Sequence, residues 1–152
     1  MKVLFVNEYA IPNIVSGAEL SMHALAKSLA EKGMEVPILS ANLSEGRNPA
    51  ISNGVKLLKF WFPKKIQQYQ ALPVFWFDNP LFWLYSTISV IRATIAEKPD
   101  IVHIHGKYML PAAILARIFT GKPAIVTVRD YKFLCPLALC LIRRNKACTF
   151  SY

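Results

Sequence analysis

The chain has 152 residues, which suits one domain with a buried core of its own. Hydrophobic residues make up 54% of it, yet no apolar run reaches the ~18–20 residues that span a bilayer, which argues against a membrane-spanning architecture. Lysine and arginine outnumber acids by 18 to 9, giving a net charge of +9, but no nucleic-acid-binding motif accompanies this charge, so nucleic acid is not an expected partner.

The first elements in the chain are a strand and a helix. Lys2–Asn7 is apolar and β-branched, and we predict the first strand here rather than a signal peptide, which favours a cytoplasmic protein. From Ala18 to Lys32 the apolar residues recur at helical spacing, with His23 on the opposite, solvated face. Gly33 is predicted to end this helix.

Two strands and a longer helix follow. Glu35–Ser40 is predicted as the second strand, which its proline places near a sheet edge, and Val55–Phe60 as a third strand in the outermost position. Asn79 is predicted to cap a helix that begins at Pro80 and runs to about Glu97. We expect this helix to be almost fully buried along the stripe Leu84, Ile88, Ile91 and Ile95.

The last predicted elements complete an α/β fold. Ile101–His105 is strand four, Leu110–Thr120 is a helix that ends at Gly121, and Ala124–Val128 is strand five. Strands this apolar, alternating with helices, predict one doubly wound, mostly parallel, Rossmann-like sheet over residues 1–152, with helices on both faces. Right-handed crossovers give the strand order 3-2-1-4-5. Ligands of such sheets bind outside the carboxyl ends of the strands, where here strands one and four part.

Strand four ends on two histidines that point to the same side if the strand is regular. His105 lies at the mouth of the crevice, beside Gly106, whose missing side chain allows backbone or a ligand to approach closely. We therefore predict a functional role for His105. His103 is expected deeper, as a hydrogen-bonded core residue, with substrate binding as the alternative role.

Two more loops reach the same crevice. Ser16 and Gly17 lead straight into the first helix, whose free N–H groups suit a phosphate, although Ser16 and Glu19 also have the spacing of a capping box. We expect Glu19 to cap and Gly17 to face a ligand. After strand five the chain places a charged pair and a tyrosine that could bind a polar or phosphorylated ligand, or trim a loop as an ion pair: Arg129, Asp130 and Tyr131.

A basic, aromatic segment separates the two halves of the sheet. Residues 46–77 contain no acid, while lysines and aromatic residues alternate. This composition suits a membrane interface or a phosphate-bearing ligand, and it also suits a solvated loop whose aromatic residues cover the core.

Three cysteines fall near the end of the chain, at Cys135, Cys140 and Cys148. Their spacing does not form a zinc knuckle, and three thiolates leave a zinc site one ligand short. We expect structural thiols. A metal site completed by a residue beyond Tyr152 is the alternative.

Taken together, five segments resemble the N-terminal domain of GT-B glycosyltransferases of family 4, in the family's order and over the whole chain apart from the variable residues 43–78. They are Lys2–Asn7, Ser16–Glu19, Lys98–Gly106, Leu110–Arg117 and Gly121–Pro136. The resemblance implies a retaining transfer of sugar from a nucleotide-sugar donor, without a metal or other cofactor. It also implies that this domain holds the acceptor and that a second domain, absent from these 152 residues, holds most of the donor.

The resemblance assigns roles to matching residues. Ser16 and Gly17 match the family's glycine-rich loop near the donor phosphates, where two glycines are usual. His105 or His103 matches the histidine-bearing strand end at the interdomain cleft, and Asp130 matches the acid after strand five. Arg129 stands where the family usually has histidine, and arginine can bind an anion but cannot act as a base near neutral pH.

The leading prediction is therefore the acceptor-binding half of a glycosyltransferase, inactive alone, with a sugar or lipid-linked acceptor. Its segment Phe60–Phe77 is expected to dock on anionic membrane, which would make the protein peripheral at the inner face of the membrane. The alternative is a non-enzymatic Rossmann-like binding module, with a cysteine-bound metal in its tail as an added option.

Overall fold

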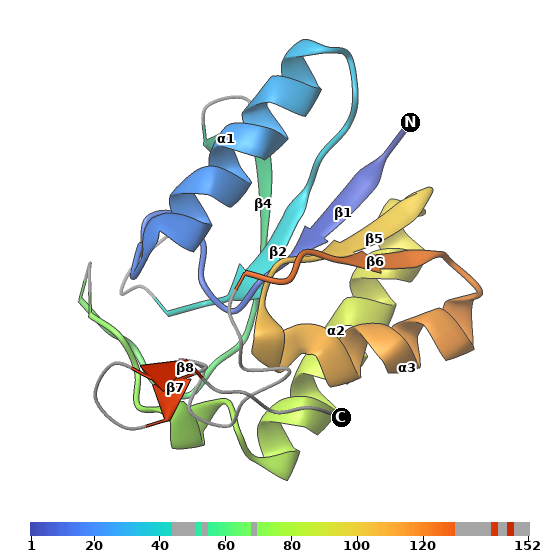
Figure 1. The fold of residues 1–152 in the computed structure, drawn as a ribbon. Coiled ribbons are helices and arrows are strands. Elements are labelled where there is room, and N and C mark those ends of the chain that lie inside the picture. The colour runs from blue at the N-terminus through green and yellow to red at the C-terminus, as the bar shows by residue number, and fades with distance from the viewer. Residues whose placement is uncertain (44–50, 53–54, 68–69, 130–140, 143–145, 148–152) are drawn as a thin grey trace.

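Five parallel strands form the centre of the structure, a computed structural model that describes residues 1–43, 51–52, 55–67, 70–129, 141–142 and 146–147 (Figure 1). Their order across the sheet is β4-β2-β1-β5-β6. The bounds are Val3–Val6 for β1, Ile38–Ala41 for β2, Val55–Phe60 for β4, Ile101–Ile104 for β5 and Ala124–Val126 for β6. The predicted α/β class, parallel pairing and strand order are confirmed.

A sixth, short strand lies outside the predicted set. β3 (Ile51–Ser52) pairs antiparallel with β4 and takes the edge position. The expectation that Val55–Phe60 would be outermost is therefore wrong, because a two-residue strand carries too little pattern to be predicted. Pro37 lies just before β2, so the ladder within that strand keeps its N–H donors.

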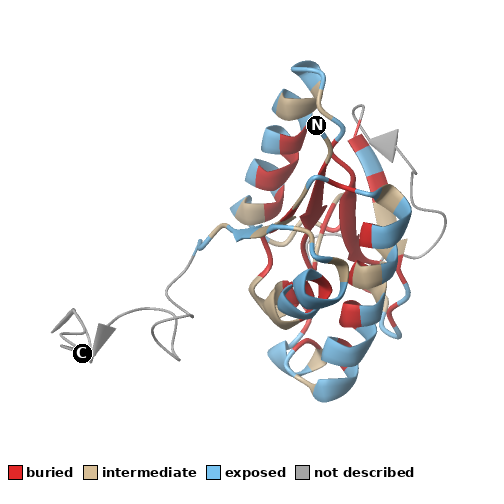
Figure 2. Cartoon of the chain, turned by 90° about the vertical axis from the view of Figure 1, so that its right-hand side faces the viewer, coloured by how far each residue is buried: buried red, intermediate tan, exposed pale blue. Residues whose placement is uncertain are grey.

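Helices cover both faces of the sheet, as predicted. α1 (Gly17–Glu31) packs on one face, and α2 (Pro80–Glu97) and α3 (Leu110–Thr120) pack on the other (Figure 1). Alternate residues of β1 serve the two cores, with Phe5 facing α1 and Leu4 facing α2 and α3. Figure 2 shows the buried residues concentrated in the sheet and on the inner sides of the helices.

Short elements connect these layers. The single-turn helix η1 (Val74–Trp76) precedes α2, and η2 (Lys107–Met109) leads from β5 into α3. β7 (Leu141–Ile142) and β8 (Lys146–Ala147) form a separate antiparallel pair. None of the helices within the described ranges combines the length and the apolar character needed to cross a bilayer.

The helix ends follow the sequence signals closely. Ser16 and Glu19 form the predicted capping box of α1. The side chain of Asn79 accepts a hydrogen bond from the Phe82 N–H at 2.9 Å and so caps α2. Gly33 and Gly121 follow α1 and α3 with φ of 80° and 67°, a left-handed conformation in which glycine meets no Cβ penalty.

The faces that α1 and α2 bury differ from those predicted. Leu84 is 62% exposed and Ile95 61%, so the expected stripe of α2 faces mostly outward. The buried side instead includes Thr87 and Thr94, whose hydroxyls donate to the carbonyls of Trp83 and Val90 one turn earlier. A hydroxyl satisfied within its own helix can face the core, and apolar periodicity alone misses this.

In α1 the buried face is likewise rotated from the predicted one. His23 is buried rather than solvated, and its ring nitrogens have no hydrogen-bond partner among the described residues. Burial, followed by the charge of Lys27, lowers the pKa of His23.

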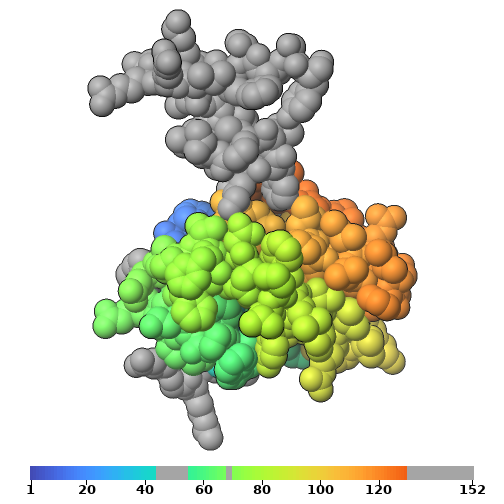
Figure 3. All heavy atoms as spheres, turned by 90° about the horizontal axis from the view of Figure 1, so that it is seen from below, coloured from blue at the N-terminus to red at the C-terminus, as the bar shows by residue number. Residues whose placement is uncertain are grey.

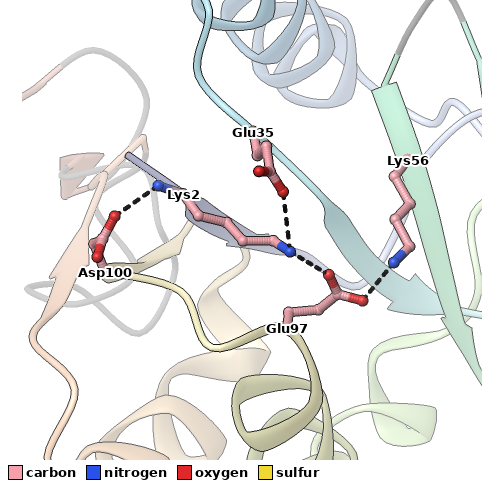
Figure 4. Close-up of polar contacts among 5 residues, drawn as sticks. All are labelled: Lys2, Glu35, Lys56, Glu97 and Asp100. Carbon is pink, nitrogen blue, oxygen red and sulfur yellow. Dashed lines mark hydrogen bonds and ion pairs between the residues drawn. The ribbon is translucent and has the colours of Figure 1, made fainter.

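A group of charged residues ties together the amino ends of the strands, opposite the crevice (Figure 4). Lys2 Nζ lies 2.8 Å from Glu97 Oε2 and 3.1 Å from Glu35 Oε2, and Lys56 Nζ lies 2.6 Å from Glu97 Oε1. The backbone N–H of Lys2 donates to Asp100 Oδ2 at 2.7 Å. This group therefore joins the end of α2 to the starts of β1 and β2 and to β4.

Candidate functional site

A pocket of about 300 Å³ opens at the carboxyl ends of β1, β5 and β6, the crevice that the strand order predicts. The start of α1 and the η1 turn close two further sides. Its walls include Asn7, Glu8, Tyr9, Ser16, Glu19, Phe77, His105, Gly106, Lys107, Tyr108, Thr127 and Arg129.

His105 sits immediately after β5 and is only 6% exposed. Its ring packs on the Phe5 ring at a centroid distance of 4.5 Å, and its Nδ1 lies 3.0 Å from a guanidinium nitrogen of Arg129. A second guanidinium nitrogen of Arg129 donates to the Ser21 hydroxyl of α1. Arg129 therefore bridges the first helix and the histidine.

The state of the His105 ring follows from this contact. Burial, together with the charges of His103 and Arg129, lowers the pKa of His105 to about 3, so the ring is neutral near pH 7. Because a guanidinium only donates, Nδ1 must accept, and the single ring proton lies on Nε2. Nε2 is buried without a hydrogen-bond partner among the described residues, so its N–H donor is left unsatisfied.

His103 lies on the same face of the sheet as His105, as predicted, with ring centroids 4.1 Å apart. Its Nε2 lies 2.7 Å from the Thr127 hydroxyl, so it is hydrogen-bonded as expected. Its exposure is intermediate while His105 is buried, so the expectation that His103 lies deeper is wrong. Burial and Arg129 lower the pKa of His103.

Glu8 is the residue that the sequence reasoning missed. It follows β1, is 5% exposed, and its Oε1 accepts a hydrogen bond from the Tyr108 N–H. Burial raises the pKa of Glu8 to about 7 even though this N–H and Lys107 favour the carboxylate. The signal was present, since Glu8 is the first acid after strand one and strand ends meet at one edge.

Gly106 is required by this arrangement. A Cβ at position 106 would collide with the carboxyl group of Glu8 and the side-chain amide of Asn7. The close approach expected at Gly106 is therefore made by the side chains of Asn7 and Glu8, which follow β1. The missing side chain of Gly106 leaves room for the Glu8 carboxyl group in the pocket wall.

The start of α1 is occupied largely by its own cap. Glu19 Oε2 accepts hydrogen bonds from the Ser16 N–H at 2.6 Å and from the Val15 N–H at 3.2 Å. Ser16 lines the pocket, whereas Gly17 is exposed and is not among its lining residues. The capping role expected for Glu19 is thus observed.

The structure brings Ser16, His105, Gly106 and Arg129 together at one pocket, with His103 behind His105. Asp130 and Tyr131 lie outside the described residues, as do all three cysteines: Cys135, Cys140 and Cys148. Within the described ranges there is no group of three or more histidine, cysteine or acidic residues that could hold a metal ion.

The family model of Glycosyltransferase Family 4 matches residues 15–136 of the chain. An uncharacterized 42.6 kDa protein in the cps region of Klebsiella pneumoniae is 27% identical over 143 residues, which cover 90% of this chain and 38% of that protein. The chain thus spans well under half the length of this curated relative.

Similar solved structures share the fold. A glycosyltransferase from Rickettsia africae matches with a TM-score of 0.56 and 18% sequence identity. The matched region covers 84% of this chain and 29% of the Rickettsia chain. Anabaena HepE, in complex with UDP and glucose, matches with a TM-score of 0.56 and 18% identity, over 90% of this chain and 32% of the HepE chain. MurG from Acinetobacter baumannii matches with a TM-score of 0.54 and 20% identity, over 82% of this chain and 34% of the MurG chain.

Proposed function

Because the chain belongs to glycosyltransferase family 4 and has the Rossmann-like fold of the N-terminal part of GT-B glycosyltransferases, we propose that it is the acceptor-binding half of a retaining, nucleotide-sugar-dependent enzyme. The observation that carries the proposal is the pocket at the switch point, whose wall includes His105 with its buried, unsatisfied N–H donor. The pocket forms one wall of a cleft, and a second domain supplies the other.

In this proposal each pocket residue has a separate binding role. His105 Nε2–H donates to an oxygen of the sugar being transferred or of the acceptor, and Arg129 holds the ring in that tautomer. Glu8 accepts a hydrogen bond from an acceptor hydroxyl, since its carboxyl group lines the same pocket. His103 supports His105 from behind.

The donor lies toward the second domain. Ser16 and Gly17 at the start of α1 face the donor diphosphate, and Arg129 after β6 supplies a positive charge to it. Substrate binding by Asp130 and Tyr131 stays a prediction from the sequence. Anionic groups are favoured at a helix N-terminus, although the Glu19 carboxylate already accepts the Val15 and Ser16 N–H groups at this one. No metal takes part in the proposed transfer.

Joining the chain to the part of the Klebsiella relative that it does not match gives a completed enzyme for the test. The measurement is nucleoside diphosphate release from a panel of UDP-, GDP- and dTDP-sugars, with a membrane extract as the acceptor source. We expect release by the completed enzyme, none by the chain alone, and a product that keeps the anomeric configuration of the donor by NMR. Turnover by the chain alone, or an inverted anomer, contradicts the proposal.

We further propose that Phe60–Phe77 docks this half on anionic membrane. The exposed residues of this segment include Trp61, Lys64 and Phe75, a combination of aromatic and basic side chains that suits a lipid interface. Sedimentation with phosphatidylglycerol vesicles at low salt is expected to pellet the chain, and phosphatidylcholine vesicles are the control. Equal partitioning to both kinds of vesicle, or none to either, contradicts this part.

A further inference from the structure

A second cavity, an apolar groove of about 630 Å³, lies beside the pocket. Its walls come from the end of β4 and the residues after it, from η1, and from the N-terminal half of α2. Several side chains that line it are largely exposed, among them Trp61, Phe75, Leu81 and Leu84. Figure 3 shows that residues of this region, in green to yellow-green, form one continuous face of the described part of the molecule.

An array of aromatic rings joins this groove to the pocket. Phe77 lines the pocket and stacks on Tyr108, another pocket residue, at 5.4 Å. Phe77 also stacks at 5.6 Å on Phe62, which lines the groove. The η1 turn is shared in the same way, because Val74 lines the pocket while Trp76 lines the groove. The two cavities therefore lie on either side of one aromatic wall.

Charge favours an anion near this wall. The described residues from 55 to 77 contain lysines and no acid, and the exposed Lys64 directly follows the groove residue Pro63. Lys107 lines the pocket, with its Nζ 5.5 Å from the Tyr108 ring centroid. The opposing acids are Asp78, beside η1, and Glu8 and Glu19 in the pocket.

We infer that the groove binds the hydrocarbon chain of a lipid-phosphate acceptor, whose polar end crosses the η1 wall into the pocket. The inference rests on the proposed function and names the acceptor class for the same site. It commits to a single lipid chain because the groove shares an aromatic wall with the acceptor pocket and has lysines beside it. Burying such a chain against exposed aromatic walls removes apolar surface from water on both sides.

The chain carries its own probe for the test. Two of the three tryptophans, Trp61 and Trp76, line the groove, and Trp83 lies on the first turn of α2, between residues that line it. Titration with farnesyl phosphate below its micellar concentration is expected to shift their emission to the blue in a saturable way. Inorganic phosphate is expected to leave the emission unchanged.

Matched variants separate the groove from general hydrophobicity. Leu84→Asn alters the groove, and Ile118→Asn alters a comparably exposed position on α3, outside the groove. Both side chains are more than half exposed, so neither change empties the core. We expect at least about tenfold weaker binding for Leu84→Asn and an unchanged affinity for Ile118→Asn.

Three outcomes overturn the inference. They are an absent or non-saturable shift, an equal loss in both variants, and self-association of the chain with the tryptophans buried, which would make the groove a contact between copies. The assay needs neither donor nor second domain. Its failure therefore leaves the sugar-transfer test standing, and failure of sugar transfer leaves saturable lipid binding standing.

Discussion

At the scale of single residues, Glu8 combines burial with a place on the wall of the pocket. Its own backbone N–H, the Tyr108 N–H and the charge of Lys107 offset the loss of water around its carboxylate, but they do so incompletely. Such a group holds its proton up to the neutral range, which makes it sensitive to what binds beside it.

Replacing Glu8 by Gln tests this directly. A folded pKa raised to about 7 from 4.5 means that the stability Glu8 contributes is fully present below pH 4.5 and is lost as the pH rises through 7. As the pH rises from 4.5 to 7, the unfolding free energy of Glu8→Gln is therefore expected to increase relative to that of the wild type by up to about 3 kcal/mol. Urea unfolding from pH 4 to 8 measures it, with Glu31→Gln at an exposed site as the control. A pH-independent difference for Glu8→Gln contradicts the assignment.

His105 makes a second residue-scale prediction. Its pKa of about 3 keeps the ring neutral, with the proton on Nε2, throughout pH 4–8. Because Arg129 lowers the pKa of His103 and His105, Arg129→Gln is expected to raise both, whereas Arg117→Gln on α3 is expected to change neither. Nitrogen-15 NMR of the three histidines reads charge and tautomer together. Titration of His105 near 6.5 in the wild type would refute the buried, neutral state.

At the scale of elements, local signals specified the ends of helices, while tertiary packing chose their faces. Ser16, Asn79 and Gly121 act through hydrogen bonds or backbone angles within a few residues, so their roles could be predicted from the sequence. The Thr94 hydroxyl donates to a carbonyl of its own helix and the side chain faces the core, so a polar residue lies where the apolar pattern predicts an exposed one. The burial of His23 was mispredicted for the same reason, because it depends on tertiary packing.

Asn79 links two elements and can be dissected by substitution. Its Oδ1 caps α2, and its Nδ2 donates to the carbonyls of Phe75 and Trp76 at 2.8 Å. Asn79→Ala loses both functions and is expected to cost at least about 1 kcal/mol of unfolding free energy. Asn79→Asp keeps the cap but loses the N–H donors, so its unfolding free energy is expected between those of the wild type and Asn79→Ala. Chemical denaturation ranks the three proteins, and an Asn79→Ala variant as stable as the wild type contradicts these contacts between η1 and α2.

The ion pairs of Glu97 give an element-scale prediction about acid. Hydrogen bonds from Lys2 and Lys56 lower the pKa of Glu97 below its usual 4.5. The stability that Glu97 contributes is therefore present above pH 4.5 and lost as the pH falls through the lowered value. Glu97→Gln is expected to cost at most about 1 kcal/mol at pH 7, because solvent screens the partly exposed lysines, and less at pH 3. A cost that grows on acidification would contradict these pairs.

At the scale of the molecule, the strand order determines where the pocket lies, and the order could be predicted from the run of strands and helices. The pocket's chemistry was harder to predict. His105 stood out because it ends an apolar strand beside a glycine, whereas Glu8 depends on a contact with Tyr108 a hundred residues away. The groove depends on residues from three elements and had no signal beyond the aromatic composition of residues 60–77.

The central claim is that the pocket around His105 is one wall of a glycosyl-transfer site. The most direct test is the initial rate of nucleoside diphosphate release by the completed enzyme carrying His105→Asn, with retained folding checked by circular dichroism and Ile118→Asn as the control. We predict a rate at least about a hundredfold below that of the unchanged enzyme, with the control unaffected. A folded His105→Asn enzyme that works within twofold of the unchanged one contradicts the account.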